Sequence, residues 1–107
     1  MGYRILLCGD IGEKGIAMLL SVNSSSDVDV SADIMQVPHH GGFTVNTEDL
    51  VESVNPVHVI ISGLAKDISP STIEQYQKHG VSLHKTHENG AVTYTINKEG
   101  IKVSTFL

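Results

Sequence analysis

Short apolar runs alternate along this chain with stretches in which apolar residues recur every three or four positions. The runs have the length of buried strands, and each is followed by Gly or Pro. They are Tyr3–Cys8, Ala32–Val37 and Val57–Ser62. The periodic stretches predict helices packed on one face, because a period of 3.6 puts those residues on a common side. They cover residues 13–22, about 47–54 and 69–79.

Boundary residues support this division. Pro38 cannot donate to a central strand ladder, Thr47 suits a helix N-cap, and Ser69-Pro70 is a typical helix start that leads to a stop at Gly80. Between the first helix and the second strand, residues 23–29 form a polar Ser/Asp loop.

Three shorter strands complete the predicted order of elements. They are Val81–Lys85, Ala91–Ile96 and Ile101–Phe106, with hairpin-type turns at Asn89-Gly90 and Lys98-Glu99-Gly100. Alternating strands and helices followed by a hairpin predict an α/β fold. We expect a mixed sheet, largely parallel, with flanking helices and a C-terminal antiparallel hairpin as its edge.

The composition indicates the class of protein but does not indicate its function. The chain has 107 residues, of which 40% are hydrophobic and 18% charged, as in a single globular domain. It lacks a run of about 18 apolar residues that would predict a membrane-spanning helix. One cysteine excludes an internal disulfide, and a net charge of -5 argues against a broad electrostatic grip on nucleic acid.

The candidate chemistry follows the ends of the predicted strands. Asp10 follows the first strand, and His39 and His40 follow the second in "VPHHGG". Ligands of parallel sheets bind where the carboxyl ends of strands meet, so a carboxylate and imidazoles there predict a metal site. If the pair is in extended backbone, adjacent side chains point opposite ways and only one histidine faces the site.

The segments "LLCGDI", "ADIMQVPHHGG", "VNPVHVIIS" and "GVSLHKTHENGAVTYTI" resemble, in order, the second half of a metallo-β-lactamase-fold hydrolase. The resemblance is to the hydrolase domain of the ComEC/Rec2 competence proteins, which act in DNA uptake, and covers about positions 3 to 104. It implies half of an αββα sandwich with a dinuclear site, usually zinc, with manganese as the other candidate. It also implies that Asp10 bridges two metals and that His39 and His40 are metal ligands or act beside the scissile phosphate.

Two departures from that family limit the expected activity. The H-x-H-x-D-H motif of the first half is absent, and "LAKDISPS" stands where relatives have an Asn-rich segment and Gly-His-Pro-His. We therefore expect residues 1–107 to be a single partial domain, inactive alone. Its expected partners are the missing N-terminal half-domain or a second copy, and DNA or another phosphodiester as substrate.

Alternative functions remain open from the sequence. One is a non-catalytic α/β module that associates with itself or with a partner through the sheet face that the missing half would cover. Another is a small-molecule or nucleotide pocket at the same strand ends, although no phosphate-binding glycine loop of the usual spacing is present.

The remaining cysteine and histidines have structural interpretations. Cys8 is expected to be a buried small hydrophobe, and His58 a core or edge residue with its polar atoms satisfied. His84 and His87 are expected at the surface, and His79 at a helix end that favours a partly positive imidazole.

Overall fold

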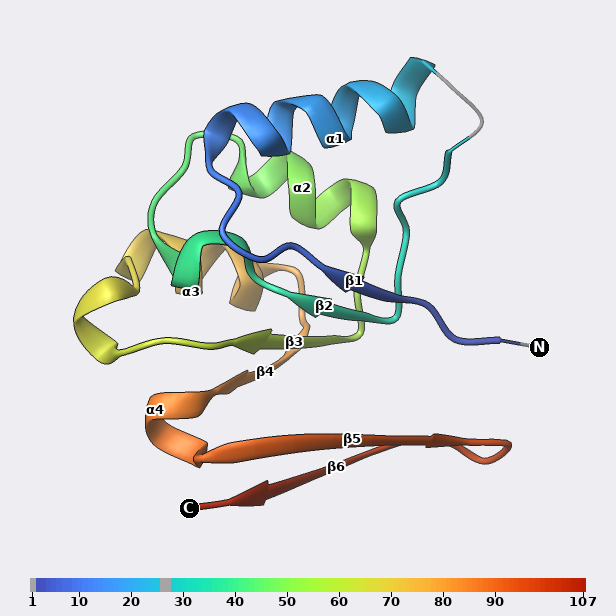
Figure 1. The fold of residues 1–107 in the computed structure, drawn as a ribbon, viewed down its shortest axis with the longest axis vertical. Helices are drawn as coiled ribbons and strands as arrows, with labels where there is room; N and C mark the ends of the chain where they lie inside the picture. Colours follow the sequence, from blue (N-terminus) through green and yellow to red (C-terminus); the bar gives the residue numbers. More distant parts are fainter. Residues whose placement is uncertain (1, 26–27) are drawn as a thin grey trace.

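A computed structural model describes residues 2–25 and 28–107 of the chain. Four short strands form one sheet in the order β1-β2-β3-β4, and every neighbouring pair is parallel (Figure 1). The strands are β1 (Ile5–Leu7), β2 (Ile34–Gln36), β3 (His58–Ile61) and β4 (Ser82–Lys85). Sequence order and spatial order coincide, so each helix between them is a crossover connection of the βαβ type.

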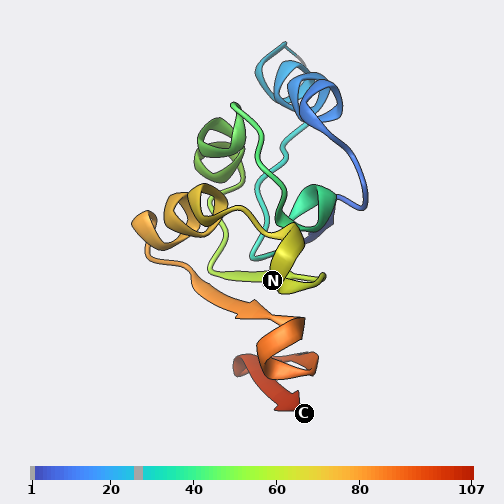
Figure 2. The same cartoon turned by 90° about the vertical axis from the view of Figure 1, so that its left-hand side faces the viewer.

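The crossover helices lie together on one side of this sheet (Figures 1 and 2). They are α1 (Glu13–Ser25), α2 (Thr47–Val54) and α3 (Pro70–Lys78). Single-turn 3₁₀ segments follow two of the strands, η1 (Pro38–Gly41) and η2 (Ala65–Asp67), and a short helix α4 (Thr86–Asn89) follows β4. The flanking helices predicted from the sequence are therefore present, and they lie on one face of the sheet.

The core lies between that helical layer and the sheet. Met35 of β2 and Val59 of β3 are register partners and are fully buried. Leu50 and Val54 of α2 and Tyr76 of α3 are buried to the same extent, each with 0% exposure. Because burial of apolar area is the main favourable term in folding, this layer of contacts holds the strand ends in place.

The C-terminal hairpin forms its own two-stranded antiparallel sheet, β5 (Ala91–Asn97) with β6 (Gly100–Phe106). Tyr94 is its contact with the parallel sheet, with ring centroids 5.7 Å from His58 and 6.3 Å from His84. Those histidines alternate with Val59 and Leu83, which pack in the core, so the hairpin lies against the face opposite the helices. The expectation that the hairpin forms an edge of a mixed sheet is therefore wrong.

The connection between β4 and the hairpin also differs from the prediction. Asn89-Gly90 is not a hairpin turn, because β4 pairs with β3 and α4 intervenes before β5. The Asn89 side chain instead accepts a hydrogen bond from the Lys85 backbone N–H at 3.0 Å, which closes the helical turn. The second predicted turn is confirmed, since Asn97 pairs with Gly100 across it.

The other predicted elements are confirmed, with shorter strands in the parallel sheet and hairpin strands that are each one residue longer than predicted. Residues 23–25 are an exception, because they continue α1 where the sequence predicted a loop. The Ser25 hydroxyl donates a hydrogen bond to the Ser21 carbonyl at 2.6 Å within this last turn. Residues 26 and 27 of that predicted loop lie outside the described residues. Asn46, not Thr47, takes the N-cap position of α2.

Strand β1 leaves apolar side chains uncovered on the face away from the helices. Ile5 and Leu7 are 52% and 74% exposed, whereas Leu6 between them packs against the core. β1 is also an edge of the sheet. Among the described residues, no helix combines the length and the apolar character needed to cross a bilayer.

Candidate functional site

Three strand ends converge at one edge of the parallel sheet. The backbone N–H of His39, after β2, donates to the Gly9 carbonyl, after β1, at 3.0 Å. The Gly9 N–H donates in turn to the Gln36 side chain at 2.9 Å. These cross-connections hold the Asp10 loop against the His39–His40 turn.

The turn that carries the two histidines is left-handed. His39 and His40 have φ of 55° and 54°, and Gly41 continues with 82°. Non-glycine residues rarely adopt this region, and doing so costs roughly 1–2 kcal/mol each. The expectation of extended backbone at this pair is therefore wrong, and contacts with neighbouring strand ends select the unusual conformation instead. Strain of this kind concentrates at functional sites.

His40 connects two of the strand ends through its ring. Its Nδ1 lies 2.7 Å from the Ser62 carbonyl oxygen after β3, and its Nε2 lies 3.5 Å from Asp10 Oδ1 after β1. A carbonyl only accepts hydrogen bonds, so Nδ1 carries a hydrogen and Nε2 is the ring atom that faces the carboxylate.

Glycines make this close approach possible. A Cβ on Gly63 would lie 3.1 Å from His40 Cβ, and a Cβ on Gly42 would lie 3.0 Å from His39 Nδ1. Gly63 is itself held by Thr86, whose hydroxyl oxygen accepts its N–H at 3.1 Å. The Ser62 carbonyl and Thr86 were not among the predicted site residues. A backbone acceptor leaves no signature in the sequence, and the Thr86 hydroxyl comes from a segment 23 residues away from Gly63 in the chain.

The structure separates the roles of the two predicted histidines. Asp10 has His40 as its imidazole neighbour within 4.0 Å among the described residues, whereas the exposed ring of His39 lies against Gly42. Both members of the Asp10–His40 pair are largely exposed, at 77% and 59% of their side-chain surface. A solvated pair of this kind adds little to the stability of the fold.

The predicted buried role of Cys8 is confirmed. Its side chain is 7% exposed, and burial raises the pKa of its thiol to about 11. Cys8 belongs to the hydrophobic core cluster and packs there as a small apolar residue.

The other histidines only partly match their predicted environments. His58 and His84 are half-buried beneath Tyr94, and the Nδ1 atom of each is buried without a hydrogen-bond partner in the described part of the chain. The predictions of a satisfied His58 and a surface His84 are therefore wrong. His87 lies near Glu88, with 3.7 Å between Nε2 and Oε2.

Asp10 and His40 fit as two ligands of one ion, but they are an incomplete set. Ligands 2.0–2.1 Å from a tetrahedral zinc lie about 3.4 Å from each other, close to the observed 3.5 Å. Across residues 2–25 and 28–107, the group of three potential ligands that converge within 4.8 Å lies elsewhere, on α2 and after α3. A zinc site with three protein ligands is thus not complete at this edge.

Comparison with known proteins finds one relative of this chain. No protein-family model matches the chain, and no solved structure matches it. The chain is similar to ComE operon protein 3 of Bacillus subtilis strain 168. The two are 24% identical over 109 residues, which cover 98% of this chain and 13% of that protein. The similarity supports the ComEC/Rec2 resemblance in part and leaves the metallo-β-lactamase origin of the fold as a hypothesis.

Proposed function

We propose that this chain is the C-terminal half of a ComEC/Rec2-like, metallo-β-lactamase-fold hydrolase that cleaves phosphodiester bonds in DNA. The observation that carries the proposal is the 3.5 Å approach of His40 Nε2 to Asp10 Oδ1, with the ring oriented by the Ser62 carbonyl. Imidazoles that bind metals commonly donate their other ring N–H to a backbone carbonyl or carboxylate, which fixes the tautomer. His40 has that arrangement.

The similarity to a protein of the ComE operon supports a competence-related role. The aligned region is 13% of that protein's length, so this chain would correspond to a small part of such a protein. An acidic chain with a net charge of -5 needs a local cation to approach a phosphodiester. A metal held at Asp10 and His40 would supply that charge.

In this proposal each residue has a separate task. Asp10 contributes the bridging carboxylate, His40 contributes Nε2 as a ligand or as a donor to the phosphate, and His39 shapes the turn beside it. Zinc or manganese, when bound, supplies a nucleophilic water and positive charge for the transition state. Because two donors are too few for a catalytic zinc, a complementary N-terminal half with an H-x-H-x-D-H motif must provide the others.

A place for that half is suggested by the uncovered side of β1. Ile5 and Leu7 point away from the helices, and β1 has one unpaired edge. Exposed apolar side chains on a sheet edge favour association with another polypeptide.

The test is reconstitution. The chain is mixed with a separately expressed N-terminal half that carries H-x-H-x-D-H, and zinc or manganese uptake and hydrolysis of single-stranded DNA are measured. We expect DNA hydrolysis when both halves are present and none with either half alone. The rate of hydrolysis should fall at least a hundredfold when the chain carries Asp10→Asn or His40→Ala. If the two halves associate and bind metal but do not cleave DNA, the proposed substrate is wrong. If neither substitution changes metal uptake by the mixture, the proposed metal site is wrong.

A second candidate is a non-catalytic module that self-associates through the same surface. The 74% exposure of Leu7 favours it, because a second copy would bury this side chain. Light scattering over a concentration series distinguishes the two candidates: a dimer that Leu7→Ser dissociates supports the module, and a monomer at every concentration excludes it.

A further inference from the structure

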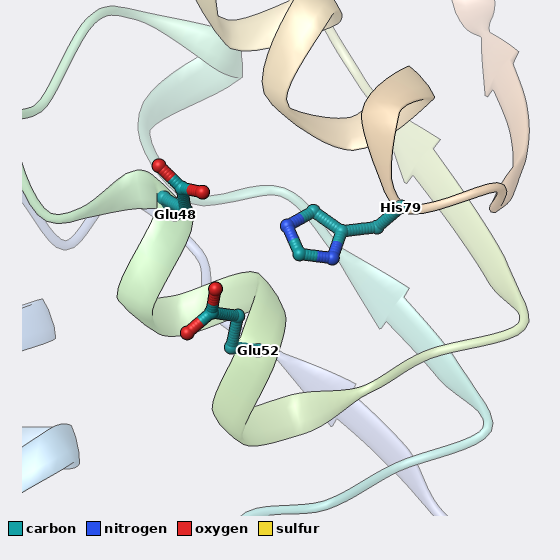
Figure 3. Close-up of side chains that lie close together, drawn as sticks. All are labelled: Glu48, Glu52 and His79. Atoms are coloured by element: carbon teal, nitrogen blue, oxygen red, sulfur yellow. The ribbon is translucent and has the colours of Figure 1, made fainter.

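A second group of potential metal ligands lies on the helical layer. It combines Glu48 and Glu52 of α2 with His79, which follows α3. One ligand atom from each residue lies within 4.8 Å of the other two. Figure 3 shows the imidazole of His79 reaching from the end of α3 toward both carboxylates.

The packing of α2 against α3 creates this group. Glu48 and Glu52 are four residues apart, so they project from the same side of α2 one turn from each other. Gly80, at φ +70°, ends α3, and the His79 N–H donates to the Tyr76 carbonyl at 3.1 Å. This capped end directs the His79 side chain toward the neighbouring helix.

Lys78 forms an ion pair between the two helices at the same point. Its Nζ lies 2.9 Å from Glu48 Oε1. The Lys78 ammonium, with a smaller effect of His79, holds the pKa of the Glu48 carboxyl below its usual value.

We propose that Glu48, Glu52 and His79 bind a divalent transition metal, with Zn²⁺ as the best-suited ion. Two carboxylate oxygens and one imidazole nitrogen are the three protein donors of an open zinc site, whereas Ca²⁺ and Mg²⁺ take oxygen donors. The bound ion would join α2 to α3. This site shares no residue with Asp10 and His40, so it does not rest on the proposed hydrolase function.

The ammonium of Lys78 competes with the ion, because it occupies one oxygen of Glu48. Its removal should therefore tighten metal binding. Lys66, in the exposed segment η2, is a matched control for loss of one positive charge elsewhere.

The experiment is calorimetric titration of the 107-residue chain with zinc chloride at neutral pH. We expect one Zn²⁺ per chain, at least tenfold weaker binding in His79→Ala and in Glu52→Gln, and wild-type binding in the double variant Asp10→Asn/His40→Ala. Lys78→Ala should bind Zn²⁺ more tightly than Lys66→Ala. Zinc should also raise the melting temperature of the wild type and not of His79→Ala.

Two results would overturn this proposal. One is no zinc uptake up to about 1 mM, and the other is uptake that survives His79→Ala and Glu52→Gln. If uptake is lost instead in the Asp10→Asn/His40→Ala variant, the metal belongs to the strand-end site, which would support the proposed function and not this one.

Discussion

His40 Nε2 and Asp10 Oδ1 lie 3.5 Å apart although they follow different strands of the sheet. A left-handed turn makes this possible, because it brings the His40 ring between the ends of β1 and β3. The candidate site therefore depends on an energetically unfavourable backbone conformation that neighbouring strand ends hold in place.

The first prediction concerns that turn. His39→Gly should be more stable than His39→Ala by about 0.5–1 kcal/mol, because the left-handed strain that glycine removes at φ 55° is larger than the cost of its greater freedom in the unfolded chain. Both variants lack the imidazole, so the comparison isolates the backbone. Chemical denaturation measures the difference. Equal stabilities would show that this turn is not left-handed in solution.

The second prediction concerns the buried end of the same turn. A Cβ on Gly41 would lie 3.0 Å from Ile61 Cγ2 and 3.2 Å from Ile68 Cγ2, at φ +82°. Gly41→Ala should therefore lower the free energy of unfolding by about 2–4 kcal/mol through strain and overpacking. Gly80 is the control, because it has φ +70° with open space around its Cβ position. Gly80→Ala should cost about 1–2 kcal/mol, and an equal cost at both positions would contradict the packing argument.

The third prediction concerns Cys8 at alkaline pH. Burial raises its thiol pKa from 9.0 to about 11, so the folded state keeps its proton where the unfolded state loses it. The corresponding stability is complete below pH 9.0 and disappears as the pH rises through 11, a loss of roughly 2–3 kcal/mol. Urea unfolding from pH 8 to 11 measures it.

Cys8→Ala separates this effect from the buried Tyr76, whose pKa burial also raises. The variant should lose less stability than the wild type over this pH range. Parallel curves for the two proteins would show that Cys8 does not stay protonated in the fold.

The fourth prediction concerns attachment of the hairpin. Tyr94→Ala removes the ring that contacts His58 and His84, and should destabilise the packing of β5–β6 by about 1–2 kcal/mol. Hydrogen exchange should accelerate in Ala91–Phe106 and not in β2 or β3. Tyr94→Phe should have little effect, since the hydroxyl makes only a long 3.5 Å contact with the Val59 carbonyl. Unchanged exchange in Tyr94→Ala would mean that other contacts hold the hairpin.

Much of the candidate site could be predicted because it depends on local patterns and on one topological rule. Parallel strands end at the same edge, so Asp10 and the histidine pair were expected together. The sequence did not identify which histidine faces Asp10, because the choice depends on the His39 N–H reaching Gly9 and on the Ser62 carbonyl reaching the ring. The Glu48–Glu52–His79 group was missed for a similar reason, as it exists only where α2 and α3 pack side by side.

By itself, the sequence determined the alternation of strands and helices, their parallel order and the buried face of α2, since hydrophobic period and Gly/Pro boundaries act within a few residues of the chain. Tertiary structure decided the left-handed turn at His39 and His40, the place of the hairpin across the sheet, and the helical turn at Thr86–Asn89. Each of these depends on hydrogen bonds or ring contacts between groups that only the assembled sheet brings together, and such contacts can outweigh local preference by a few kcal/mol.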